Sequence, residues 1–116
     1  MIVIKAIPKK LLIHTISIYE KVEKDRWGKE NLGEGTIVKK VRLEPSSKIV
    51  RDKNKAEIQI AAVMFYDCKN SVPKGMTFKE DEIVMFNGQK HRIKTVEPLY
   101  DEGKLHHYEL GLIKHD

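Results

Sequence analysis

The sequence has little of what secreted and membrane proteins rely on. It holds one cysteine, Cys68, so no internal disulfide can form and a reducing cytoplasm is the expected place of assembly. No apolar run approaches the roughly 18 residues that span a bilayer, and the first ten residues lack the long apolar stretch of a secretory signal. We therefore expect a single domain over residues 1–116 with no membrane partner.

Metal-binding and catalytic signatures are also missing. There is no Cys-x-x-Cys, His-x-x-x-His or His-Glu-x-x-His spacing. His106 and His107 are adjacent, so on a regular strand they would point to opposite faces. We expect no cofactor, no metal and no catalytic residue. A metal-dependent enzyme that uses His91, His106 or His107 is the weakest alternative.

The hydrophobic residues that are present alternate with polar ones, which is the period of β-strands. Asn87-Gly88 is the residue pair typical of a two-residue type I′ hairpin turn. The pattern predicts an all-β protein, a small antiparallel barrel or sandwich of about six strands, and leaves room for one short helix in 67–72 or 77–82. The expected strands are Leu11–Val22, Thr36–Leu43, Glu57–Tyr66, Glu82–Phe86, His91–Val96 and Leu105–Ile113, with loops at 72–75 and 98–103.

Charge is concentrated in one place. The whole net charge of +5 falls in residues 39–55, which hold seven Lys and Arg side chains against two carboxylates, while the rest of the chain is balanced. Residues 45–56 also lack a clear hydrophobic period, so they are predicted to form a protruding basic loop. A localised cluster of this kind indicates a contact with a partner. Ile49 and Val50, which a purely solvated loop has little reason to keep, favour a loop that orders on assembly.

The only tryptophan, Trp27, lies in a charged, glycine-bearing segment beside Arg26. Two interpretations are open. The favoured one is a plug that folds back onto the barrel. The other is a subunit or partner contact made by Arg26 and Trp27, because Trp and Arg are enriched in protein interfaces.

Several segments resemble a family of minor capsid proteins encoded by tailed bacteriophages and prophages of Gram-positive bacteria. The resemblance runs nearly end to end and in order. The segments are Lys5–His14, Asp25–Gly28, Val41–Asp52, Phe65–Ser71, Thr95–Asp101 and Leu105–Glu109. More loosely, the run from Phe78 to Glu109 is similar to the barrel portion of phage head-closure, or stopper, proteins.

The resemblance implies a structural protein of the virion, made in the host cytoplasm and built into the head-to-tail connector. Its partners would be neighbouring copies in a ring, portal and adaptor proteins, tail proteins and the packaged double-stranded DNA. The ring would close the portal channel after packaging and provide the docking surface for the tail. The loop residues expected to contact DNA or the portal are Lys48, Ile49, Arg51, Lys53 and Lys55.

Two alternatives remain at this point. A tail-completion or tail-terminator protein would use a related barrel. A nucleic-acid-binding barrel of the OB type would stack bases on aromatic side chains within a basic groove. Residues 39–55 contain no aromatic residue, which counts against the OB type.

Overall fold

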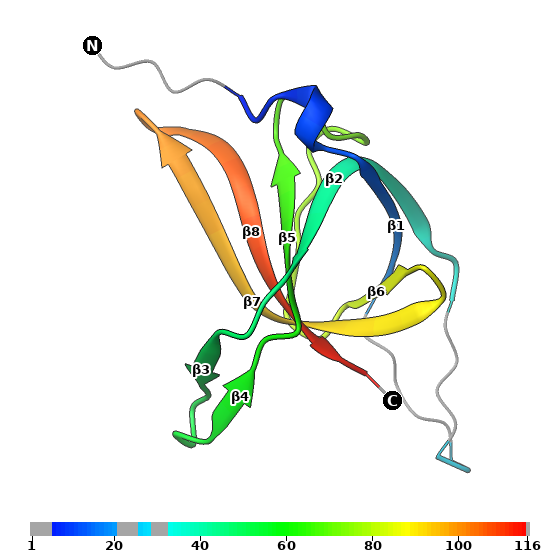
Figure 1. Cartoon of the computed structure of the whole chain (residues 1–116). Helices are drawn as coiled ribbons and strands as arrows, with labels where there is room; N and C mark the ends of the chain where they lie inside the picture. Colours follow the sequence, from blue (N-terminus) through cyan, green and yellow to red (C-terminus); the bar gives the residue numbers. More distant parts are fainter. Residues whose placement is uncertain (1–5, 21–25, 29–32, 116) are drawn as a thin grey trace.

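The alternating hydrophobic pattern produces a barrel. We analysed a computed structural model, which describes residues 6–20, 26–28 and 33–115. Six antiparallel strands close in the order β1-β2-β5-β8-β7-β6, so the all-β barrel expected from the sequence is confirmed (Figure 1). They are β1 His14–Tyr19, β2 Thr36–Pro45, β5 Ala62–Asp67, β6 Ile83–Phe86, β7 Gln89–Asp101 and β8 Lys104–Lys114.

The inward-facing side chains of these strands form one hydrophobic core. Apolar residues of every barrel strand are buried there, because alternate residues of each strand point inward. Phe78, from the segment before β6, packs edge-on against Tyr66 and Tyr108 with ring centroids 5.2 Å apart in both cases. The barrel interior is therefore filled by side chains and leaves no channel through the described core.

Two further strands form a hairpin outside the barrel. β3, Ile49–Arg51, pairs with β4, Glu57–Gln59, and this pair projects from the end of the barrel between β2 and β5 (Figure 1). The predicted loop over 45–56 therefore contains the strand β3, and its pairing with β4 follows on from the pairing of β2 with β5. The single strand predicted over Glu57–Tyr66 is divided into β4 and β5. The break falls at Ile60, whose side chain is buried, and Ala61, whose N–H donates to the carbonyl of Leu112 at 2.8 Å.

The remaining differences concern element ends. Neither 67–72 nor 77–82 is helical, and the only helical turn in the described ranges is the 3₁₀ turn η1, Lys9–Leu11. The predicted loop 98–103 is mostly strand, since β7 continues to Asp101. No helix of the described residues has the length and apolar character needed to cross a bilayer.

Candidate functional site

The basic hairpin, defined as residues 46–61, is held by backbone hydrogen bonds. Its base continues the barrel ladder, with Ser46 N–H donating to Ala61 at 3.0 Å and Ile60 N–H donating to Lys48 at 2.8 Å. Its tip is closed by Asp52, whose Oδ1 accepts the N–H groups of Asn54 at 2.8 Å and Ala56 at 3.0 Å. The segment predicted as a protruding basic loop is therefore a hairpin whose local hydrogen bonds are made within the chain itself.

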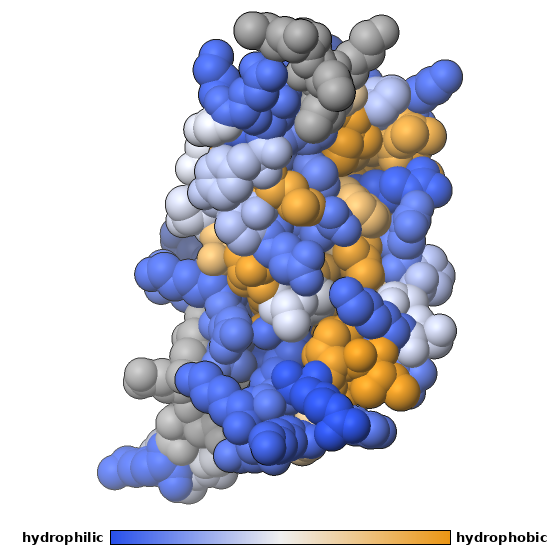
Figure 2. Space-filling model, turned by 90° about the vertical axis from the view of Figure 1, so that its left-hand side faces the viewer, coloured by the Kyte–Doolittle hydropathy of each residue, from blue (hydrophilic) through white to orange (hydrophobic). Residues whose placement is uncertain are grey.

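The hairpin has two different faces, because β3 side chains alternate. Ile49 and Arg51 point away from the barrel, and Ile49 is 58% exposed. Figure 2 views the left-hand side of Figure 1, and it shows an apolar patch toward the lower right with hydrophilic side chains around it. An apolar residue among exposed cations suits a partner surface better than free solvent.

The cations at the outer end of the hairpin are available for contact. Arg51 lies 3.4 Å from the Glu57 carboxylate across the hairpin, but both side chains are about two-thirds exposed, so water screens the pair. Lys53 and Lys55 are exposed, and no ion pair joins either of them to another described residue. The tip therefore presents these three cations from one narrow strip.

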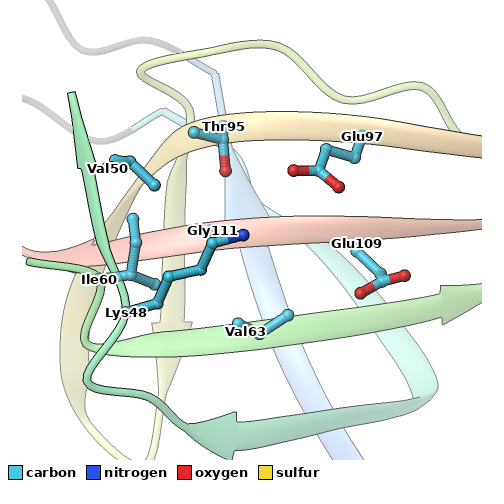
Figure 3. A pocket seen from close by; sticks show the side chains of 8 residues that line it. All are labelled: Lys48, Val50, Ile60, Val63, Thr95, Glu97, Glu109 and Gly111. Atoms are coloured by element: carbon cyan, nitrogen blue, oxygen red, sulfur yellow. The ribbon is translucent and has the colours of Figure 1, made fainter. Parts of the chain in front are cut away.

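Lys48 lies differently from the other cations. Together with Val50 it lines a small hollow on the outer wall of the barrel, over β7 and β8 (Figure 3). Glu97 and Glu109 line the same hollow and are directly opposite each other in the β7–β8 register. Two like charges in facing positions repel each other. Lys48 lines the hollow with these two carboxylates, and the His107 Nε2 atom lies 3.1 Å from the Glu109 carboxylate, so the position of Lys48 is that of a residue between the hairpin and the barrel wall.

Glu97 and Glu109 were not identified from the sequence. Their pairing depends on the β7–β8 register, and the segment after Val96 was assigned to a loop. No local signal in the sequence could have placed these two carboxylates together.

The Arg26–Trp27 pair is also visible. The Arg26 guanidinium lies over the Trp27 ring, 4.2 Å from its centroid, and Trp27 is 72% exposed. The prediction that Trp27 plugs the barrel is therefore wrong. The exposed, arginine-covered ring keeps the partner-contact interpretation open.

Two of the histidines meet at an irregularity in the β7–β8 pairing. Leu99 pairs with His107 and Tyr100 with Leu105, so His106 is the extra residue of a β-bulge. The bulge brings the two imidazoles together, with their Nδ1 atoms 2.6 Å apart, and the expectation that they point to opposite faces is wrong. Within the described ranges no group of three or more His, Cys, Asp or Glu residues could hold a metal ion.

Cys68 is half-buried at the end of β5. Burial raises the pKa of its thiol, and the neighbouring Asp67 carboxylate raises it further. A thiol with a raised pKa has little thiolate at neutral pH, which disfavours a nucleophilic role.

Comparison with known proteins identifies the family. The model of the minor capsid protein family matches residues 8–112. The matched range covers all six barrel strands except the last two residues of β8, and it includes the whole basic hairpin. A search of curated proteins gives no match. The chain therefore belongs to the phage minor capsid protein family, and its role is that of a structural component of the virion.

Proposed function

We propose that this minor capsid protein acts at the head-to-tail junction, where copies assemble into a ring that closes the portal DNA channel after packaging and docks the tail. The barrel is the rigid body of each subunit, and the basic hairpin is the contact element. The protein works by binding and not by catalysis. The observation that carries the proposal is a β-hairpin that projects from one end of the barrel and holds four Lys and Arg side chains against two carboxylates, Asp52 and Glu57.

A ring makes this charge effective. An exposed lysine contributes little to binding on its own, because water and salt screen it. Copies around an axis place their hairpins close together, so modest contacts become collectively strong. DNA, with one phosphate charge per about 1.7 Å of helix axis, and acidic surfaces of the portal or adaptor are the partners such a collar would attract.

Neighbouring copies would meet head to tail, since that arrangement closes into a ring when the rotation between copies allows it. The exposed Arg26–Trp27 pair is the proposed subunit contact. Trp and Arg side chains are the ones that most often dominate interface energies.

The test is a phage that carries Arg51→Gln, Lys53→Gln and Lys55→Gln together. We expect virions that lose DNA from filled heads, or heads that fail to join tails, as seen by electron microscopy and infectivity. The matched control replaces three exposed lysines outside the hairpin, Lys69, Lys79 and Lys104, which changes the net charge equally. Normal particles from the hairpin variant would refute the role of the hairpin.

The same particles distinguish the proposed role from the alternative role in the tail. A tail-completion or tail-terminator protein would leave heads that retain their DNA and connect normally, with tails of abnormal length or unfinished ends. Heads that lose their DNA would instead support the proposed role in closing the channel.

A further inference from the structure

The end of the barrel from which the basic hairpin leaves β2 and β5 is hollow. Side chains of all six barrel strands surround a space of about 480 Å³, which lies within the range of small-molecule sites, and barrel mouths are a common place for such sites. One lining residue from each strand in chain order is His14, Leu43, Ala62, Phe86, His91 and Lys114.

His91 is the reason to consider a ligand. Its side chain is 7% exposed, and its Nδ1 is buried without a hydrogen-bond partner among the described residues. A buried imidazole nitrogen without a partner is unusual in a folded protein, so a polar group that reaches His91 would gain a hydrogen bond. The space is far larger than the roughly 30 Å³ that one water molecule occupies, so it can admit an organic group.

The opposite wall of the hollow is fixed and apolar. His14 Nδ1 accepts the N–H of Leu43 at 3.0 Å, which holds the imidazole, and the ring of Phe86 packs edge-on against it with centroids 4.9 Å apart. Leu43 and Ala62 add aliphatic surface. This wall suits an aromatic or aliphatic group.

One carboxylate, Glu44, and one lysine, Lys114, line the hollow. Glu44 lines it, but its Oε1 lies 2.8 Å from Arg42 Nε, so that carboxylate is already compensated. Lys114 is the cross-strand partner of His91, and no ion pair joins it to another described residue. Cross-strand partners have Cβ atoms about 5 Å apart, so His91 and Lys114 can both donate to one acceptor group.

We propose that the barrel mouth binds a carboxylate carried on an apolar group, with the carboxylate between His91 and Lys114 and the apolar part against Phe86 and Leu43. This chemistry is found in acidic peptide segments that carry an aromatic residue, and in free organic acids. The proposal does not depend on the role at the head-to-tail junction.

The experiment uses the full chain and the imidazole NMR signals of histidine-labelled protein. One arm titrates phenylacetate, and the other titrates a short end-blocked peptide with adjacent Phe and Asp. We expect a saturable shift of the His91 signals. These signals are identified by their absence from the spectrum of a His91→Asn variant, or by resonance assignment. Phenylacetamide, which has the same shape without charge, should bind much more weakly.

Lys114→Gln should weaken binding by about fivefold, the upper range for a partly screened ion pair. Lys104→Gln, at the other end of β8, is the matched control and should have no effect. Saturable binding of either carboxylate probe supports the site. Tighter binding of the peptide identifies a protein segment as the ligand, and tighter binding of phenylacetate identifies a free acid. No saturable shift with either probe, or equal binding of the amide, would overturn the proposal.

Discussion

Asp67 ties the N-terminal segment to the barrel at the end opposite the basic hairpin. Its side chain is fully buried and accepts the N–H groups of Ile7 at 3.1 Å, Lys69 at 3.2 Å and Asn70 at 2.8 Å. Asn70 Nδ2 returns a bond to the carbonyl of Ile7 at 2.8 Å. A buried carboxylate is stable only when hydrogen bonds replace its lost hydration, and here backbone donors supply them.

Asp67→Ala should therefore be costly. It leaves several N–H groups without acceptors, and we expect the free energy of unfolding to fall by about 3 kcal/mol. Urea unfolding followed by circular dichroism measures this. Glu80→Ala, which removes an exposed carboxylate, should change the stability by less than about 0.5 kcal/mol. Equal effects of the two substitutions would mean that the Asp67 bonds contribute nothing beyond the removal of a charge.

One buried phenol, Tyr66, and two half-buried groups, the Tyr108 phenol and the Cys68 thiol, predict sensitivity to alkali. Burial raises the pKa of Tyr66, Cys68 and Tyr108 above their usual values. The folded protein then holds these protons more tightly than the unfolded chain does. The stability they support is complete at a pH well below about 8.5, the pKa of a thiol in the unfolded chain, and is lost as the pH rises toward the raised folded values.

Tyr108→Phe tests this directly. The variant should match the parent near pH 8 and should lose less stability than the parent between about pH 9 and pH 11, because one ionising group is gone. Urea unfolding at a series of pH values gives both curves. Parallel curves over that range would show that Tyr108 does not take part.

At the scale of elements, turn chemistry was predictable and strand ends were not. Asn87 and Gly88 have φ values of 51° and 74°, so the expected type I′ turn is confirmed. Glu102 and Gly103 form the same kind of two-residue connection, with φ values of 48° and 89°, but Pro98 had suggested that the strand ends earlier.

The position of Pro98 explains that difference. β6 pairs with β7 over Gln89–Arg92, and Asp81 and Glu82 continue the hydrogen bonds to Ile93, so the part of β7 after Ile93 has one edge without a strand partner among the described residues. A proline whose missing N–H faces a free edge costs no ladder bond.

The candidate site was likewise only partly predictable. Charge counts located its cations, whereas the Glu97–Glu109 pairing and the barrel mouth depend on register and closure, which a single sequence does not specify.

The order of the basic hairpin depends on its tip. Asp52→Ala removes the acceptor for the N–H groups of Asn54 and Ala56, a loss of about 1 kcal/mol for each hydrogen bond. We expect faster amide hydrogen exchange for residues 49–59 and unchanged exchange in the barrel strands, because the hairpin lies outside the core. Asn54→Ala keeps the Asp52 acceptor and is the control. Faster exchange throughout the barrel would instead make the hairpin part of the global folding unit.

At the scale of the whole molecule, the family match and the barrel agree with the sequence resemblance over residues 8–112. The proposed collar for duplex DNA and a reader of single strands need different side chains. Arg51, Lys53 and Lys55 lie at the outer end of the hairpin, and residues 46–61 include no aromatic side chain. Cations contact phosphates of any sequence, whereas strong single-strand binding needs aromatic rings on which bases stack.

Purified protein should accordingly bind duplex DNA weakly and with a defined salt dependence. Three phosphate contacts per copy predict a slope of about −3 for the logarithm of the association constant against the logarithm of salt concentration. Fluorescence anisotropy with labelled duplexes measures it. The variant with Arg51→Gln, Lys53→Gln and Lys55→Gln should bring the slope close to zero, while the Lys69, Lys79 and Lys104 variant should leave it unchanged. An unchanged slope in the hairpin variant would place the phosphate contacts elsewhere on the barrel, and tighter binding to single strands than to duplexes would favour the OB-type alternative over the collar.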